Sequence, residues 1–291
     1  MSVSLNSTSD TYAIDYAGVP LHCYIFNNRD YPPNRHGLGV RSGSERDVKR
    51  LEKVCHDLRF KTEVFLDQTS SEARKIIRDI STRDYTNTGG LIVFIMSHGN
   101  KGGSLAFTDG LLVYLNEFIE PFKSNKTLQG KPKMFFVQAC RGENFMSSHV
   151  QTDSAGVNDF QVEDITIPVE ADFLYAYSTI EGFYSFIDPE SGTWYIQTLC
   201  DVIEKYKTTK DVSLILVEVN DKIAQRETIK NQKMMHTCTN QLRKLFYFAK
   251  QENQKMKQSL MRYLKLLLIQ LLLLLLPAIQ QQLSKQIWHI T

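Results

Sequence analysis

The sequence predicts an α/β protein built on a largely parallel β-sheet, and three observations lead to that prediction. Apolar segments at residues 21–26, 91–98 and 133–140 have the length and the aromatic or β-branched content of buried strands. Between them lie segments whose apolar residues recur at helical spacing. Strands that alternate with helices along the chain favour a parallel sheet with right-handed crossover connections.

Signals at the ends of the elements place them along the chain. Ser44 and Asp47 can cap a helix that begins there, and Thr69 with Glu72 can cap the next one. Glycine-containing turns then precede a helix around residues 115–122. The remaining expected elements are a short strand at 63–66, a strand at 171–179, helices at 192–206 and 211–227, and a last strand at 242–248.

Composition restricts the class of protein. With 291 residues, 42% hydrophobic and 23% charged, the chain can bury a substantial core in one or two domains. A formal net charge of +2 gives no reason to expect a nucleic-acid partner. Gly37 and Gly39 lack the third glycine of a dinucleotide-binding loop, and no metal-ligand spacing is present. The sequence therefore predicts no cofactor and no metal.

The five cysteines are widely spaced, and no two of them form a Cys-x-x-Cys pair. Four of them lie in apolar strand or helix context, where a cysteine usually acts as a small core residue. An odd number of cysteines without an amino-terminal signal sequence favours a reducing compartment, so we expect a cytoplasmic protein. The cysteines expected in the core are Cys23, Cys55, Cys200 and Cys238.

Candidate catalytic groups lie at the ends of two of the predicted strands. Cys140 ends one strand beside an arginine, where a thiol can be exposed and its thiolate favoured, and Gly142 can give the following turn its backbone freedom. His98 and Gly99 end another strand. Because sites form at the carboxyl ends of parallel strands, we expect the imidazole and the thiol at one edge of the sheet. The alternatives are a buried structural cysteine and a histidine that merely ends a strand.

These motifs resemble those of the caspases. The pentapeptide Gln-Ala-Cys-Arg-Gly at residues 138–142, with a histidine upstream, is the signature of that family, and the similarity runs from about residue 12 to residue 248. The resemblance implies a three-layer fold with a central, mostly parallel six-stranded sheet and helices on both faces. It also implies a cysteine endopeptidase with Cys140 as nucleophile and His98 as general acid and base. The backbone N–H groups of Gly99 and Cys140 would form its oxyanion hole.

The resemblance also implies how a substrate is recognised. Caspases require aspartate before the scissile bond and hold its carboxylate with two arginines and a glutamine. Arg41 and Gln138 match the first arginine and the glutamine, whereas Ile187 stands at the position of the second arginine. Losing one partner of a buried charge can cost ~3–5 kcal/mol, so cleavage after aspartate would be weakened, further so if Asp188 points inward. The two aromatic residues nearby either line the substrate or pack in the core. The matching segment comprises Tyr184, Ser185 and Phe186.

The same resemblance predicts the organisation of the chain. The parts are a short disordered prodomain at 1–10, a large subunit at 11–153, a small subunit at 154–250 and a Leu/Gln-rich tail at 251–291, with processing at Asp10 and Asp153. We expect an effector-type zymogen, protein substrates, a homodimer of processed subunit pairs, and an upstream caspase or inhibitor proteins as regulators. The alternative is a weak or inactive homologue that binds an active caspase as decoy or regulator.

The tail has a low-complexity composition. Its leucine-rich stretch at 266–279 is interrupted by Gln270 and is shorter than the ~20 apolar residues that a membrane span needs. We therefore expect an extension outside the fold, with a membrane anchor as the alternative.

Overall fold

A computed structural model gives the fold of the chain. It describes residues 11–12, 20–32, 37–100, 102–142, 144, 146–147, 171–249, 262–266 and 268. Asp10, Asp153 and most of the tail lie outside these residues. The chain divides into two compact units, residues 1–250 and 251–291, of which the second is helical at 262–266 and 268. Within the described ranges, no helix has the length and apolar character needed to cross a membrane.

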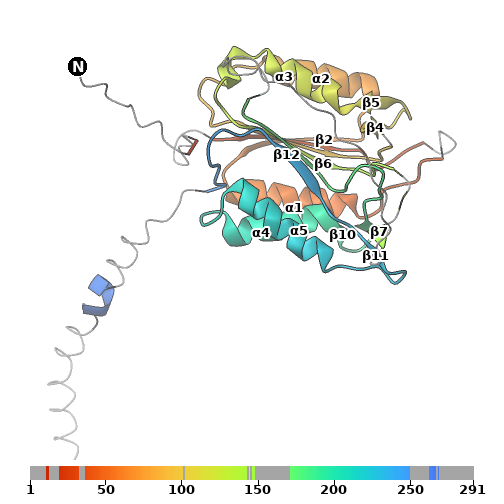
Figure 1. Cartoon of the computed structure of the whole chain (residues 1–291). Coiled ribbons are helices and arrows are strands. Elements are labelled where there is room, and N and C mark those ends of the chain that lie inside the picture. Colours follow the sequence, from red (N-terminus) through yellow and green to blue (C-terminus); the bar gives the residue numbers. More distant parts are fainter. Residues whose placement is uncertain are drawn as a thin grey trace, which may run out of the picture. The chain divides into compact units, whose positions relative to one another are not determined.

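A six-stranded sheet forms the centre of the first unit (Figure 1). Its strands are β1 (His22–Asn27), β2 (Lys61–Leu66), β3 (Leu91–Met96), β6 (Lys133–Gln138), β8 (Phe173–Tyr177) and β12 (Thr237–Asn240). They lie in the order β12-β8-β6-β3-β1-β2, and every neighbouring pair is parallel except β12 with β8. The prediction of a mostly parallel six-stranded sheet is confirmed.

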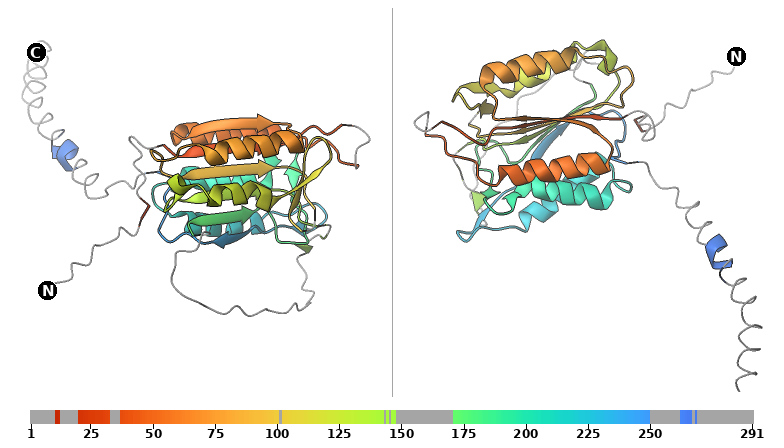
Figure 2. Two further views of the ribbon diagram at one scale, coloured as in Figure 1. Left: turned by 90° about the horizontal axis from the view of Figure 1, so that it is seen from above. Right: turned by 180° about the vertical axis from the view of Figure 1, so that it is seen from behind.

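Helices cover both faces of this sheet, as predicted (Figures 1 and 2). The helices are α1 (Ser44–Asp57), α2 (Ser70–Thr82), α3 (Leu115–Lys123), α4 (Trp194–Tyr206) and α5 (Val212–Ala224). Successive side chains of a strand point to opposite faces. Ile25, Phe94 and Phe136 therefore pack against α1, α4 and α5, whereas the alternate residues pack against α2 and α3.

Short elements complete the described part of the first unit. They are the strand pairs β4 (Ser104–Ala106) with β5 (Leu112–Tyr114), β7 (Met146–Ser147) with β11 (Gln232–Lys233) and β9 (Ile187–Asp188) with β10 (Gly192–Thr193), and the 3₁₀ turn η1 (Lys126–Leu128). All three strand pairs are antiparallel. The pair β9–β10 carries Ile187 and stands beside the amino-terminal end of α1, because a Cβ at Gly43 would lie 2.3 Å from the Asp188 carbonyl oxygen.

The expected last strand at 242–248 is wrong. The edge strand is the more polar β12, which pairs with β8 along its full length. Phe246 and Phe248 are fully buried, and their rings meet edge to face with centroids 5.1 Å apart. The apolar pattern of this segment therefore reflects irregular chain packed in the core rather than a strand.

The expected cap of α1 is also wrong. Gly43 occupies the N-cap with φ 96°, and its N–H donates to the Glu45 carboxylate at 3.0 Å. Asp47 is instead fully buried, and it accepts hydrogen bonds from the Thr193 backbone at 3.0 Å and from Gln197 at 2.7 Å. Burial raises the pKa of Asp47 to about 6. Its carboxylate thus ties α1 to the start of α4 rather than capping its own helix.

The cysteine prediction is confirmed in three of four cases. Cys23, Cys55 and Cys200 are buried and free, and the Cys55 thiol donates to the Cys23 sulfur at 3.4 Å. Cys238 is exposed because it lies on the edge strand β12.

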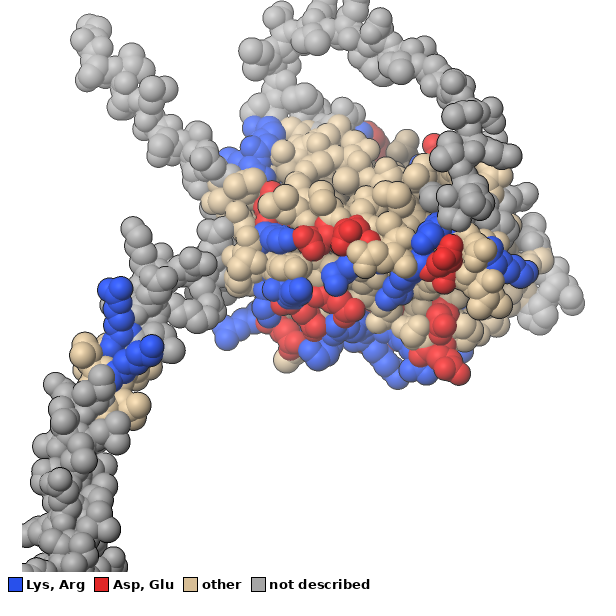
Figure 3. All heavy atoms as spheres, turned by 60° about the horizontal axis from the view of Figure 1, so that its bottom comes forward, with Lys and Arg blue, Asp and Glu red and all other residues tan. Residues whose placement is uncertain are grey.

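Acidic and basic side chains are interspersed on the face formed by α1, α4 and α5 (Figure 3). Arg50 of α1 donates to Asp201 at 2.8 Å and to Glu204 at 2.6 Å, and Lys53 reaches Glu204 at 3.2 Å. Such partly exposed pairs each contribute little, yet together they join helices that are distant in the sequence.

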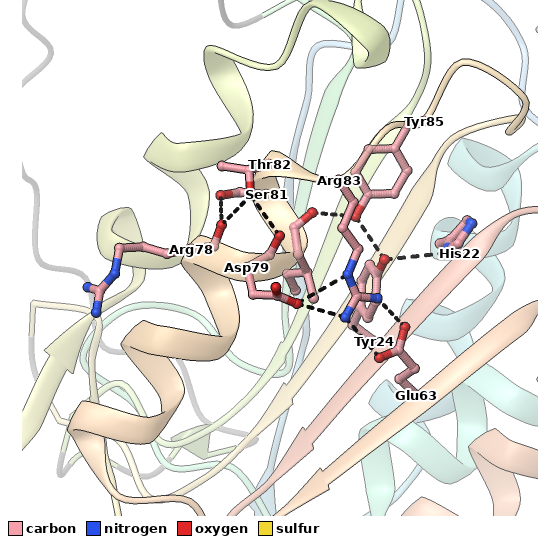
Figure 4. A network of polar contacts seen from close by, with 10 residues as sticks. His22, Tyr24, Glu63, Arg78, Asp79, Ser81, Thr82, Arg83 and Tyr85 are labelled. Atoms are coloured by element: carbon pink, nitrogen blue, oxygen red, sulfur yellow. Dashed lines mark hydrogen bonds and ion pairs between the residues drawn. The ribbon is translucent and has the colours of Figure 1, made fainter.

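A polar network ties β1 and β2 to the end of α2 (Figure 4). Arg83 donates to both oxygens of the Glu63 carboxylate. Behind this pair, the Tyr24 and Tyr85 hydroxyls lie 2.8 Å apart, and the Tyr85 hydroxyl donates to the Ile80 carbonyl oxygen at 2.6 Å. Both tyrosines are fully buried, so no water can replace a lost partner.

Tyr85→Phe is expected to lower the free energy of unfolding by about 1–3 kcal/mol, because the Ile80 carbonyl and the Tyr24 hydroxyl each lose a buried partner. Tyr195→Phe is the matched control: Tyr195 is equally buried, and its hydroxyl has no partner among the described residues. Removing an unpartnered buried hydroxyl should be neutral or stabilising. Chemical denaturation of both variants measures the difference, and equal destabilisation would contradict the assignment.

Candidate active site

The ends of β3 and β6 bring His98, Gly99 and Cys140 to one edge of the sheet. Met96 pairs with Gln138 at the last register position of the two strands, so the residues that follow leave the sheet side by side. Gly99 lies directly against Cys140, since a Cβ there would be 2.3 Å from the Cys140 carbonyl oxygen. Only glycine permits this approach at position 99.

The His98 imidazole is held in a defined orientation. Its Nε2 lies 2.7 Å from the carbonyl oxygen of Gly39. A carbonyl can only accept, so Nε2 carries the hydrogen and Nδ1 keeps its lone pair. The Tyr31 ring packs on the imidazole at 4.9 Å, and the Tyr31 hydroxyl accepts from the His98 backbone N–H at 3.3 Å. Burial lowers the pKa of His98 against the effect of the Gly39 hydrogen bond, so the ring is a neutral base at pH 7.

The Cys140 thiol lies against the backbone of Ser185. The Ser185 N–H donates to Sγ at 3.5 Å, and Sγ donates to the Ser185 carbonyl oxygen at 3.7 Å. Burial raises the pKa of Cys140, although the Ser185 N–H and the charge of Arg41 act in the opposite direction. Across the described residues, no hydrogen bond joins Cys140 to His98. Burial thus favours the thiol over the thiolate at Cys140 and the neutral imidazole over the imidazolium at His98.

Arg141 does not stabilise a thiolate, contrary to expectation. Its guanidinium stacks over the Tyr177 ring at 4.2 Å and approaches the Glu181 carboxylate at 3.5 Å. These two contacts hold the positive charge of Arg141 beside β8. The pKa of Cys140 is accordingly set by burial, which favours the protonated thiol.

Gly142 allows a close approach of two chain segments. The Arg141 N–H donates to the Phe183 carbonyl at 3.0 Å, and the Gly182 N–H donates to the Arg141 carbonyl at 2.9 Å. A Cβ at Gly142 would lie 2.3 Å from the Gly182 carbonyl carbon and oxygen. Gly142 does not have a positive φ, so the expectation that it provides turn freedom is wrong. Its small size is what positions the Cys140 loop against Ser185.

Arg41 is buried, and its charge acts on the thiol of Cys140. It is 5% exposed, and its charge acts on both Cys140 and His98. One guanidinium nitrogen, Nη1, donates to the Asn27 side chain at 3.1 Å and to the Asn28 carbonyl at 2.9 Å. These contacts to the end of β1 fix the guanidinium beside the edge of the sheet.

Gln138 is the last residue of β6 and is 3% exposed. Its Nε2 donates to the Ser185 hydroxyl at 2.8 Å, and that hydroxyl donates to the Met234 sulfur at 3.5 Å. The Gln138 Oε1 atom has no hydrogen-bond partner among the residues that the structure describes. Gln138 and Asn27 flank Met96 at one level of the sheet, so Gln138 lies on the same face as the residue that binds Arg41.

The segment after Ser185 carries an aliphatic residue where a charge is expected from the resemblance. Ile187 is partly buried and pairs with Thr193 of β10. Asp188 is exposed, and its carboxylate accepts from the backbone N–H groups of Glu190 and Ser191 at 2.8 and 2.9 Å. Asp188 therefore closes a surface turn rather than pointing inward.

The aromatic residues of this segment are partly buried. The Phe186 ring packs on Trp194 with centroids 4.9 Å apart, which is a core contact. Tyr184 donates its N–H to the Asn144 carbonyl at 2.9 Å and so continues the pairing begun at Arg141.

Comparison with known proteins agrees with this geometry. The model of the caspase domain matches residues 21–247. The chain belongs to the caspase family. Caspase-3 of Xenopus laevis is 36% identical over 231 residues, which cover 78% of this chain and 80% of that protein. Caspase-7 of Gallus gallus is 34% identical over 219 residues, 73% of this chain and 69% of that protein. A crystal structure of caspase-1 from Spodoptera frugiperda matches with a TM-score of 0.74 and 29% identity, covering 87% of this chain and 98% of that one.

Several described residues of this caspase site were not identified by the sequence analysis. Gly39 holds the imidazole, Tyr31 packs on it, and Asn27 holds Arg41. Gly39 acts through a carbonyl oxygen, which every residue type possesses. The aromatic Tyr31 stands in a polar loop after the first strand, and this was the signal that could have drawn attention to it.

Proposed function

We propose that this caspase is a cysteine endopeptidase that cleaves proteins after aspartate, in apoptosis or related proteolytic signalling. One observation carries the proposal: the thiol of Cys140 and the imidazole of His98, which is held at Nε2 by Gly39, follow neighbouring strands at one edge of the sheet, with Gly99 packed on Cys140. The identity to caspase-3 and caspase-7 supports the same reaction class.

In the proposed reaction, Sγ of Cys140 attacks the peptide carbonyl carbon while Nδ1 of His98 takes the thiol proton. The imidazolium then gives this proton to the leaving amine, and His98 later activates the water that hydrolyses the thioester. Among the described residues, the backbone N–H groups of Gly99 and Cys140 donate to no acceptor. They are the proposed oxyanion donors, each worth ~3 kcal/mol.

Arg41 and Gln138 are the proposed contacts for the substrate side chain before the scissile bond, with Tyr184, Ser185 and Phe186 beside it. Ile187 supplies no charge there. A missing partner for a buried carboxylate can cost ~3–5 kcal/mol, which corresponds to about two to four orders of magnitude in rate. We therefore expect aspartate cleavage that is real but inefficient.

We further propose a cytoplasmic zymogen that is cut near Asp153 into subunits 11–153 and 154–250, with removal of residues 1–10 after Asp10. The exposed edge strand β12 supports assembly of two such pairs into a homodimer, because an unpaired strand edge readily pairs with a second copy.

A second function is a binding-only homologue that acts as decoy or regulator of an active caspase. Ile187 favours it, because this side chain removes a charge from substrate recognition. Under this alternative, Cys140→Ala would leave the effect of the protein in cells unchanged.

The testing experiment is turnover of a peptide library varied at the residue before the scissile bond. The full chain is used both intact and after cleavage within residues 148–170, with Cys140→Ala as the control. Cleavage after aspartate that is lost in Cys140→Ala supports the proposed protease. If a folded, cleaved sample hydrolyses no peptide, the binding-only function replaces it.

A further inference from the structure

The loop after β1 brings Tyr31 against the end of β3, where the imidazole of His98 lies. Tyr31 is 7% exposed, and its ring centroid is 4.9 Å from that of the imidazole. Three polar groups surround its hydroxyl: the His98 N–H at 3.3 Å, the Ala106 carbonyl oxygen at 3.1 Å and the Ser97 hydroxyl at 3.0 Å. One side chain therefore contacts both the ring and the backbone of the proposed general base.

The hydroxyl of Tyr31 joins the two backbone segments that set the direction of the Gly99 N–H. The Ala106 N–H donates to the His98 carbonyl oxygen at 2.9 Å. In a trans peptide the carbonyl and the following N–H point in opposite directions, so this bond turns the Gly99 N–H away from β4. The Tyr31 hydroxyl binds the N–H of His98 on one segment and the carbonyl of Ala106 on the other. It thereby holds the proposed base and the proposed oxyanion donor in fixed relative positions.

The ring of Tyr31 acts on the imidazole by excluding water. Burial and the charge of Arg41 lower the pKa of His98, whereas the hydrogen bond to Gly39 raises it. The thiol of Cys140 is kept neutral by burial and adds no charge. Tyr31 also lines a cavity of about 530 Å³, whose carboxylates are those of Asp30, Asp67 and Asp109. A small side chain at position 31 would expose the imidazole to water and to these carboxylates, and both favour the imidazolium.

We infer that Tyr31 is a positioning residue of the proposed reaction. Its hydroxyl fixes the backbone of His98 and Gly99, and its ring keeps water away from the imidazole. The inference rests on the proposed protease function and adds to it a residue from a loop outside the two catalytic motifs. A tyrosine that only filled the core would affect stability and leave the chemistry of His98 unchanged.

Two substitutions separate the hydroxyl from the ring. Tyr31→Phe removes only the hydroxyl. For the full chain cleaved within residues 148–170, we expect its kcat to fall about tenfold with KM unchanged, because misplaced catalytic groups slow the chemical step. Its acid limb of kcat/KM should match that of the wild type, since the ring still covers the imidazole. Tyr31→Ala removes the ring as well, and its acid limb should move upward, toward the ordinary histidine pKa of 6.5.

Tyr85→Phe is the matched control, because it removes another fully buried tyrosine hydroxyl, from the network at the end of α2. This variant is expected to lose stability while kcat, KM and the acid limb keep their wild-type values. A kcat of Tyr31→Phe within about twofold of the wild type overturns the inference. An acid limb that does not move in Tyr31→Ala overturns it as well.

A titration that needs no catalysis separates this inference from the proposed function. In Cys140→Ala, NMR follows the imidazole signal of His98 across pH, and the signal is assigned by its loss when His98→Ala is added. The pKa of His98 is expected below 6.5, and adding Tyr31→Ala should raise it. This rise without peptide turnover by the wild type would contradict the protease and leave the action of Tyr31 on the imidazole standing. Turnover by the wild type together with an unchanged titration would do the opposite.

Discussion

Cys140→Ala is expected to lower kcat/KM for peptide cleavage by about 10⁴-fold or more, because removal of the nucleophile leaves only binding and oxyanion contacts. The fold should be unaffected, since the thiol makes only long contacts with the Ser185 backbone, at 3.5 and 3.7 Å. Steady-state kinetics with an aspartate peptide, together with a denaturation curve, measure both quantities.

Cys238→Ala is the matched control for this substitution. Cys238 is a free, exposed cysteine on the edge strand β12, away from the carboxyl ends of β3 and β6. Full activity is expected for this variant, and sedimentation must show that it assembles as the wild type does, because β12 is also the proposed dimer edge. If Cys140→Ala kept more than a trace of activity, Cys140 would not be the nucleophile.

His98→Ala is expected to lower kcat/KM by about 10²–10⁴-fold, the usual contribution of a general acid and base. The pH profile gives a second readout. Burial lowers the pKa of His98 below its ordinary value of 6.5. Protonation of Nδ1 at lower pH removes the base, so the acid limb of kcat/KM for the wild type should lie below pH 6.5.

His56→Ala controls for the loss of an imidazole as such, because His56 lies on α1 with its side chain 90% exposed. Its kinetics and its acid limb should match those of the wild type. An acid limb above pH 6.5, or equal losses in the two variants, would show that His98 does not act as the neutral base.

The sheet was predictable from the sequence where its strands are buried on both faces. β1, β3 and β6 are such strands, and their continuous apolar segments mark them. β12 was missed because an edge strand with three exposed residues lacks that pattern. The segment at 242–248 has the pattern, yet Phe246 and Phe248 fill the core outside the six strands of the sheet.

The candidate site divides in the same way. His98 and Cys140 lie in short motifs whose residue types indicate their catalytic chemistry. Other contacts of the site join residues that are distant in the sequence and whose types do not indicate a function. They are made by the carbonyl of Gly39, the amide of Asn27 and the sulfur of Met234. The state of the thiol was also unpredictable, because burial and the position of Arg141 decide it rather than the neighbouring sequence letter.

The part of the chain before residues 148–170 contacts the part after them throughout the first unit. β6 pairs with β8, Arg141 and Gly182 exchange backbone hydrogen bonds with their opposite segments, and Asp47 binds the start of α4. Cleavage in that segment would convert a unimolecular fold into a complex of two polypeptides. Refolding would then become second order, and the denaturation midpoint would rise with protein concentration by mass action. Folding of the intact chain is unimolecular, so its rate should not depend on protein concentration. Synthesis as one polypeptide therefore allows the two parts to fold together before any cleavage.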